Sequence, residues 1–177
     1  MILLSSAKIR KRFTESKVAF MLLAALVTAG CQASPTPDEA QWISAEQATL
    51  EYKDEARKLA LAPGWEWPQG RQYESHASDG NEINYGVNTG RVDAAWYWHC
   101  TWARNYFSAT STAERGAAFQ QVLRLKESAF YHYGLVSEDK GPRDRVLALA
   151  ESGETEQLRD TIEANCPRKD MNLSREG

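Results

Sequence analysis

Apolar residues recur every three or four positions over most of the chain from residue 44 onward, a spacing that predicts helices. The first helix is predicted over residues 44–62, with Ser44 as the N-cap and Gln47 at the capping-box position. Its apolar stripe consists of Ala45, Ala48, Tyr52, Ala56 and Leu59. Pro63 and Gly64 follow directly and are expected to stop it.

A second helix is predicted from Ala94 to about Ala109, with Asp93 as its cap. This segment is rich in aromatic residues, and its apolar side chains form two stripes. The first stripe is Trp96, Cys100, Ala103 and Phe107, and the second is Ala95, Trp98, Trp102 and Tyr106. A helix that is apolar on two faces should lie at the centre of a bundle.

A third helix is predicted to begin after Ser111, which forms a capping box with Glu114, and to run to about Tyr133, where Gly134 ends it. Its apolar side chains keep the same spacing: Phe119, Val122, Leu125, Ala129 and Tyr133.

Two shorter helices are predicted toward the C-terminus. Pro142, at a first-turn position, opens the fourth helix, and Gly153 ends it. The fifth runs from about Thr155 until Pro167, with apolar positions at steps of four: Leu158, Ile162 and Cys166. The expected fold class is therefore all-α, a small bundle of about five helices over residues 44–166, and the polar tail 167–177 is expected to be disordered.

Residues 63–92 form an irregular, glycine- and tryptophan-rich insertion between the first and second helices. Asp79-Gly80 is typical of a turn, and a short hairpin fits around residues 83–85. A calcium loop is excluded here because Ile83 stands where an oxygen ligand is needed. An irregular segment of this length in a compact domain is often functional, so the candidate site is expected here.

Four residues of the insertion form the candidate binding surface: Trp65, Glu66, Trp67 and Tyr85. Two interpretations of the tryptophans remain open. The indoles could stack on sugar rings beside the Glu66 carboxylate, or one or both could fold back against the helices and add apolar area to a small core.

The N-terminus has the parts of an export signal. Five basic residues within the first 17 precede the uncharged, mostly apolar run of residues 18–29. As a helix this run is about 18 Å long, short of the roughly 30 Å of hydrocarbon in a bilayer. Residues 1–30 are therefore predicted to be a signal peptide.

The sequence Leu26-Val27-Thr28-Ala29-Gly30-Cys31 resembles the lipobox of bacterial lipoproteins. The resemblance implies cleavage after Gly30 and attachment of diacylglycerol to the sulfur of Cys31, often with acylation of the new amine. Two or more acyl chains give stable membrane anchoring. Residues 31–43, which contain Pro35 and Pro37, are expected to be a short tether.

Charge shapes the expected relation to the membrane. The whole chain has a net charge of −3, with 21 basic and 24 acidic residues. Residues 1–30 contain five of the basic residues and one of the acidic residues, so residues 31–177 have a net charge of −7. An acidic domain excludes an electrostatic nucleic-acid site. It is also not attracted to anionic lipid headgroups, so the lipid alone is expected to attach it to the bilayer.

With Cys31 lipidated, Cys100 and Cys166 remain as a pair in an oxidising compartment, and a disulfide between them is predicted. The alternatives are two buried free thiols or a metal pair with His99. Metal binding is disfavoured because no CxxC or His-rich spacing occurs. His99 itself is interpreted as a satisfied histidine on a helix surface or at an interface.

The sequence contains no HExxH, GxSxG, P-loop or GxGxxG motif, and no cofactor or metal is predicted. The expected function is that of a non-enzymatic binding module of the bacterial envelope, lipid-anchored in the cell membrane or outer membrane and facing the periplasm or exterior. Its partners would be the membrane, through the lipid, and an envelope protein or glycan. The alternative is a glycan-binding protein or glycan hydrolase that uses the Trp65-Glu66-Trp67 loop, with Glu66 or Glu74 as the acid.

Overall fold

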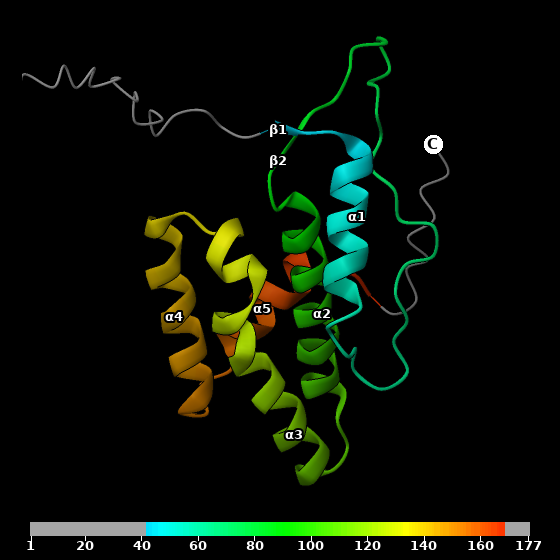
Figure 1. The fold of residues 1–177 in the computed structure, drawn as a ribbon. Helices are drawn as coiled ribbons and strands as arrows, with labels where there is room; N and C mark the ends of the chain where they lie inside the picture. Colours follow the sequence, from blue (N-terminus) through cyan, green and yellow to red (C-terminus); the bar gives the residue numbers. More distant parts are fainter. Residues whose placement is uncertain (1–41, 169–177) are drawn as a thin grey trace, which may run out of the picture. The chain divides into compact units, whose positions relative to one another are not determined.

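The computed structural model describes residues 42–168 and confirms a mostly helical fold (Figure 1). Within this range lie helices α1 (Ala45–Ala56), α2 (Thr89–Ser108), α3 (Thr112–Leu123), α4 (Ser137–Glu151) and α5 (Glu156–Asn165). The predicted signal peptide, Cys31 and residues 169–177 of the predicted tail lie outside the described residues. No helix of the described range is long and apolar enough to cross a membrane.

A two-stranded antiparallel sheet joins the residues just before α1 to those just before α2. Strand β1 (Trp42–Ile43) pairs with β2 (Tyr85–Gly86), with Trp42 opposite Gly86 and Ile43 opposite Tyr85. Trp42 and Ile43, expected to be the end of the tether, are thus part of the folded domain. A tight hairpin lies just before β2, where Ala77 N–H donates to the Asn81 carbonyl at 2.8 Å and Ile83 N–H to the Ser75 carbonyl at 2.9 Å. Asp79-Gly80 forms its turn, as predicted.

The start of α1 is as predicted, but its end is not. Ser44 Oγ accepts from the Gln47 N–H and Gln47 Oε1 accepts from the Ser44 N–H, which completes the capping box. The helix ends at Ala56, so its predicted extension to Ala62 is wrong. The reason is tertiary: the Ala60 carbonyl accepts from Trp102 Nε1 at 2.9 Å, and the Ala62 N–H donates to Thr101 Oγ1 at 3.3 Å. The backbone of residues 57–59 still bonds back to α1, whereas Ala60 and Ala62 bond to α2.

Helix α2 begins at Thr89, so the prediction that Asp93 caps it is wrong. Its N-cap is Asn88, in the left-handed conformation with φ 73°. The side chain of Glu51 on α1 acts as a cap from a distance, accepting from the Asn88 N–H at 3.0 Å and the Gly90 N–H at 3.3 Å. Helix α2 packs against α1, α3 and α5, which confirms its predicted central position.

The predicted continuous helix from Ser111 to Tyr133 is broken into three parts. The Ser111–Glu114 capping box is confirmed, but α3 ends at Leu123, a 3-10 turn follows over Arg124–Glu127, and a π-helical turn spans Phe130–Gly134. Ser128 causes the break: its hydroxyl donates to the Leu125 carbonyl at 2.6 Å and accepts from the Tyr131 N–H at 3.3 Å. It therefore ends one turn and caps the next.

Helix α4 starts at Ser137, so Pro142 lies inside it and does not open it as predicted. Proline has no N–H, so α4 lacks the backbone bond that residue 142 would otherwise donate one turn back. Helix α5 agrees with its prediction, and its apolar side chains Leu158 and Ile162 are buried, as is Cys166 just beyond it.

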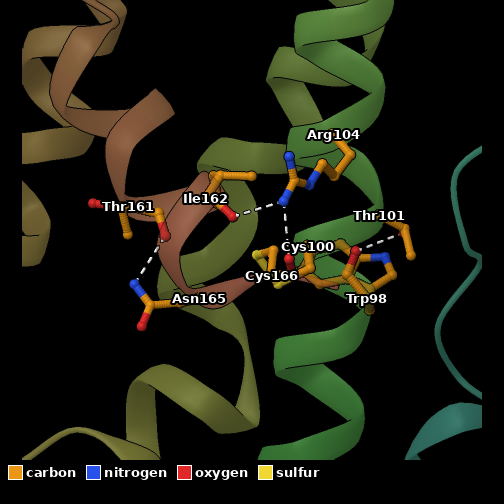
Figure 2. The surroundings of a disulfide bond; sticks show 8 residues. All are labelled: Trp98, Cys100, Thr101, Arg104, Thr161, Ile162, Asn165 and Cys166. Carbon is orange, nitrogen blue, oxygen red and sulfur yellow. Dashed lines mark hydrogen bonds between the residues drawn. A yellow bond between two sulfur atoms is a disulfide. The ribbon is translucent and has the colours of Figure 1, made fainter. Parts of the chain in front are cut away.

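The predicted disulfide joins Cys100 on α2 to Cys166 at the end of α5, with 5.4 Å between the two Cα atoms (Figure 2). It lies in the main apolar cluster, which also contains Val122, Leu125 and Leu147. The Arg104 guanidinium donates to the carbonyls of Ile162 at 3.1 Å and Cys166 at 2.9 Å, so α2 also holds the last turn of α5 through a hydrogen-bonded cation. Because both sulfurs are bonded to each other, the alternatives of free thiols or a metal pair with His99 do not apply.

His99 is not the surface or interface histidine that was predicted. It is fully buried, and neither ring nitrogen has a hydrogen-bond partner among residues 42–168. Its ring packs against Trp96, with 5.4 Å between ring centroids, and Trp96 in turn lies beneath the Arg143 guanidinium. Burial, together with the charge of Arg143, lowers the pKa of His99 from 6.5 to about 3.

We therefore expect acid to destabilise the fold through His99. The unfolded chain takes up this proton below pH 6.5 and the folded chain only near pH 3, so stability falls as the pH drops between these values. The loss attributable to His99 should be roughly 1 kcal/mol for each pH unit in this window.

Urea unfolding of the wild type and of His99→Leu between pH 7 and pH 4 measures this loss: the variant should show the shallower pH dependence. His132→Gln, at an exposed position, is the control and should follow the wild type. Parallel curves for wild type and His99→Leu would contradict the prediction.

Candidate functional site

The segment of residues 57–88 between α1 and α2, here called the strap, contains the hairpin and β2 but no helix, and several of its residues bond to α1 or α2 (Figure 1). Three residues of α2 at a spacing of four face it: Asp93, Tyr97 and Thr101. Tyr97 donates its hydroxyl to the Glu66 carbonyl at 2.8 Å, and Thr101 accepts from Ala62. From α1, Thr49 Oγ1 accepts from the Tyr73 N–H at 3.2 Å. These bonds satisfy backbone groups that a loop would otherwise expose or leave unpaired.

Asp93 on α2 binds two polar side chains of the strap. Its Oδ2 accepts from the Tyr73 hydroxyl at 2.6 Å and from the Arg71 guanidinium at 2.9 Å. The same guanidinium lies over the rings of Tyr73, at 5.3 Å, and Tyr52, at 5.9 Å. One carboxylate on α2 thus holds a cation and a phenol from the strap against α1.

Burial and these charges move the local pKa values. Burial, reinforced by the hydrogen bond to Asp93, raises the pKa of Tyr73, and burial raises the pKa of Tyr52 to about 12. Burial alone would lower the pKa of Arg71, but the facing Tyr73 and Asp93 outweigh it, so that pKa is raised. At neutral pH the two phenols are therefore protonated and Arg71 is charged.

Both tryptophans of the predicted binding surface fold back onto the helices. Trp67 packs on Tyr97, with 5.5 Å between ring centroids, and edge-on against Tyr52, at 5.9 Å; Trp65 packs edge-on against Tyr97 at 6.3 Å. Both indoles are half-buried. The inner faces of both indoles therefore pack on the helices, as the second of the two interpretations predicted.

The other two predicted site residues lie differently. Glu66 is exposed, and it is its backbone carbonyl that binds Tyr97. Tyr85 packs against Tyr73, with 5.0 Å between ring centroids, and donates its hydroxyl to the Glu74 carbonyl at 2.9 Å. Tyr85 is therefore held near the hairpin end of the strap, in a different ring pair from the tryptophans.

A cavity of about 510 Å³ opens where the strap, α2 and the end of α5 meet. Aromatic rings of Tyr52, Trp96 and Tyr97 line it, together with charged or polar side chains from both sides: Arg71, Asp93, Glu163, Asn165 and Arg168. A second hollow of about 420 Å³ lies on the α1 side and shares Tyr52, Pro68 and Arg71 with the first. Volumes of roughly 300–1,000 Å³ are usual for small-molecule sites.

The cavity contains residues that the sequence did not identify. Asp93 was interpreted as a cap, and Arg71 and Asn165 were not singled out. The spacing of Asp93, Tyr97 and Thr101 is a signal that could have been used, because polar residues at steps of four on a helix share one face. The contribution of α5 had no comparable signal.

The charges around the cavity are balanced, with Asp93 and Glu163 opposed by Arg71 and Arg168. Within residues 42–168 no three His, Cys, Asp or Glu side chains are grouped so that they could hold a metal ion. Comparison of the chain with models of known protein families, with curated proteins and with solved structures finds no match.

Proposed function

We propose that this chain is a lipid-anchored, non-enzymatic binding module of the bacterial envelope, and that the cavity between the strap, α2 and α5 is its binding site. The cavity is the observation that carries the proposal, since it combines aromatic walls with a few convergent polar groups. The resemblance of residues 26–31 to a lipobox supports the location, in the cell membrane or outer membrane with the domain facing the periplasm or exterior. The disulfide is consistent with such an oxidising compartment.

Binding is favoured over glycan hydrolysis by the positions of the acidic groups. The candidate acids Glu66 and Glu74 are exposed and do not line this cavity. Asp93, which does, is already paired with Arg71 and Tyr73. A general acid must be free to give a proton to the substrate, and this carboxylate already accepts two hydrogen bonds from the protein.

The tryptophans of the strap act indirectly in this proposal. Trp67 packs on Tyr52 and Tyr97, two of the rings that line the cavity, and Trp65 packs on Tyr97. They therefore position the aromatic wall, and their outward faces extend the surface that a larger partner would meet.

A photoreactive amino acid placed in the full chain tests the proposal in cells. At Asn165, on the cavity rim, it should give a defined cross-linked adduct in the membrane fraction after irradiation. At Gln120, an exposed position on α3 away from the cavity, the same group should give none. Equal adducts from the two positions, or no adduct from Asn165, would overturn the cavity as the binding site.

A further inference from the structure

We infer that the ligand of this cavity is an uncharged saccharide unit bound through its ring face and hydroxyl groups. This inference rests on the proposed function and names its ligand class. Three properties of the cavity lead to it: the kind of apolar surface, the unused hydrogen-bonding groups, and the balance of charge.

The apolar surface combines three aromatic rings with the smaller side chains of Pro68, Ala164 and Pro167. The rings are those of Trp96 and Tyr97, adjacent on α2, and of Tyr52 on α1. Trp96 and Tyr97 are half-buried, and Tyr52 is buried. These rings are held from behind: Trp96 stacks on Phe130 with 4.5 Å between centroids, and Tyr97 packs on Trp67 at 5.5 Å. Aromatic rings that are held in place suit a ligand with an apolar face, such as the C–H face of a pyranose.

The polar groups offer both acceptors and donors. Among residues 42–168, Asp93 uses only Oδ2, while its Oδ1 and the Glu163 carboxylate take part in no hydrogen bond. Asn165 donates through Nδ2 to Thr161, which leaves its Oδ1 free (Figure 2). Arg71 spends one of its nitrogens on Asp93 and retains further N–H groups. Hydroxyl groups both donate and accept, so a polyol can satisfy this mixed set.

The charges disfavour an ionic ligand of either sign. An anion would meet Asp93, Glu163 and the negative end of the α5 dipole, and a cation would meet Arg71 and Arg168. A neutral ligand avoids both repulsions. Its groups can still form charge-assisted hydrogen bonds to carboxylate and guanidinium, which are stronger than neutral ones.

Three tetrasaccharides that differ in charge test the ligand class. The full chain in detergent would be titrated with the tetramer of N-acetylglucosamine, which is neutral, with that of glucosamine, which is cationic, and with that of galacturonic acid, which is anionic. Binding is followed by calorimetry and by tryptophan fluorescence. We expect the neutral tetramer to bind saturably and at least tenfold more tightly than either charged one.

Matched variants place the binding at the cavity. The double substitution Glu163→Ala and Asn165→Ala removes two exposed acceptors from the rim and should weaken binding of the neutral tetramer about tenfold, as the loss of hydrogen bonds of this kind typically does. Glu156→Ala removes the same charge from the other end of α5, outside this cavity, and should leave binding unchanged. Equal weakening by both changes, or none by the double substitution, would overturn the inference.

The outcomes separate the inference from the function on which it rests. If the neutral tetramer shows no saturable binding up to about 10 mM, or a charged one binds more tightly, the saccharide class is wrong. If an adduct still forms from Asn165 in cells, the binding module itself stands. If neither binding nor an adduct is found, both proposals fail.

Discussion

Replacing Gly90 with alanine should destabilise the fold by about 3 kcal/mol or more, at the upper end of the range for overpacking. Helices α1 and α2 cross at this residue. A Cβ built on Gly90 would lie 2.1 Å from the Ala48 carbonyl oxygen, 2.6 Å from the Tyr52 backbone nitrogen and 2.8 Å from the Glu51 Cβ. Two of these atoms are backbone, so only separation of the helices can relieve the clash. That movement would also weaken the bond from the Gly90 N–H to Glu51.

Gly116→Ala is the matched control for this change. Gly116 also lies in a helix, but a Cβ there meets nothing within 4 Å. Alanine should therefore stabilise α3 by about 0.5–1 kcal/mol, since it loses less backbone entropy on folding. Chemical denaturation of both variants gives the two free energies of unfolding. A loss below about 1 kcal/mol for Gly90→Ala would show that α1 and α2 do not approach each other this closely.

Removing the disulfide with Cys100→Ala and Cys166→Ala together should cost about 4 kcal/mol of stability. The bond closes a loop with a sequence separation of 66, and this value follows from the chain entropy that such a loop removes from the unfolded state. The double variant avoids leaving an unpaired buried thiol. Urea unfolding of the variant and of the wild type should differ by this amount in non-reducing buffer.

Dithiothreitol provides the control for the disulfide. Wild type unfolded in reducing buffer should lose a similar free energy, and the variant should be unaffected by the reductant. A difference of less than about 1 kcal/mol between variant and oxidised wild type would mean that Arg104, which also binds the end of α5, holds this wall of the cavity by itself.

Local signals in the sequence were sufficient for some elements. The capping boxes at Ser44 and Ser111 placed the starts of α1 and α3, and the apolar steps of four placed α5 and the burial of Cys166. These predictions held because the determining residues lie within a turn or two of one another. Two other helix ends depend on contacts distant in sequence: Glu51 caps α2 and Thr101 binds the backbone beyond α1.

The candidate site, too, could be predicted only where its signals are local. The sequence directed attention to the segment around Trp65 and Trp67, and this segment does form one side of both hollows, through Pro68 and Arg71. The opposite wall comes from Asp93 and from the end of α5, which the disulfide brings to α2. A cavity built from four parts of the chain, α1, the strap, α2 and the end of α5, has no local pattern, so periodicity and turn signals could not predict it.

The intact mass of the protein extracted from membranes, alkylated without prior reduction, tests most directly the claim that this is a lipid-anchored envelope domain. We expect a chain that begins at Cys31, carries at least two acyl chains and has no alkylated cysteine, because Cys100 and Cys166 are joined. A chain that retains residues 1–30, has no lipid and carries alkyl groups on its cysteines would contradict it, since both the anchor and the oxidising compartment would then be wrong.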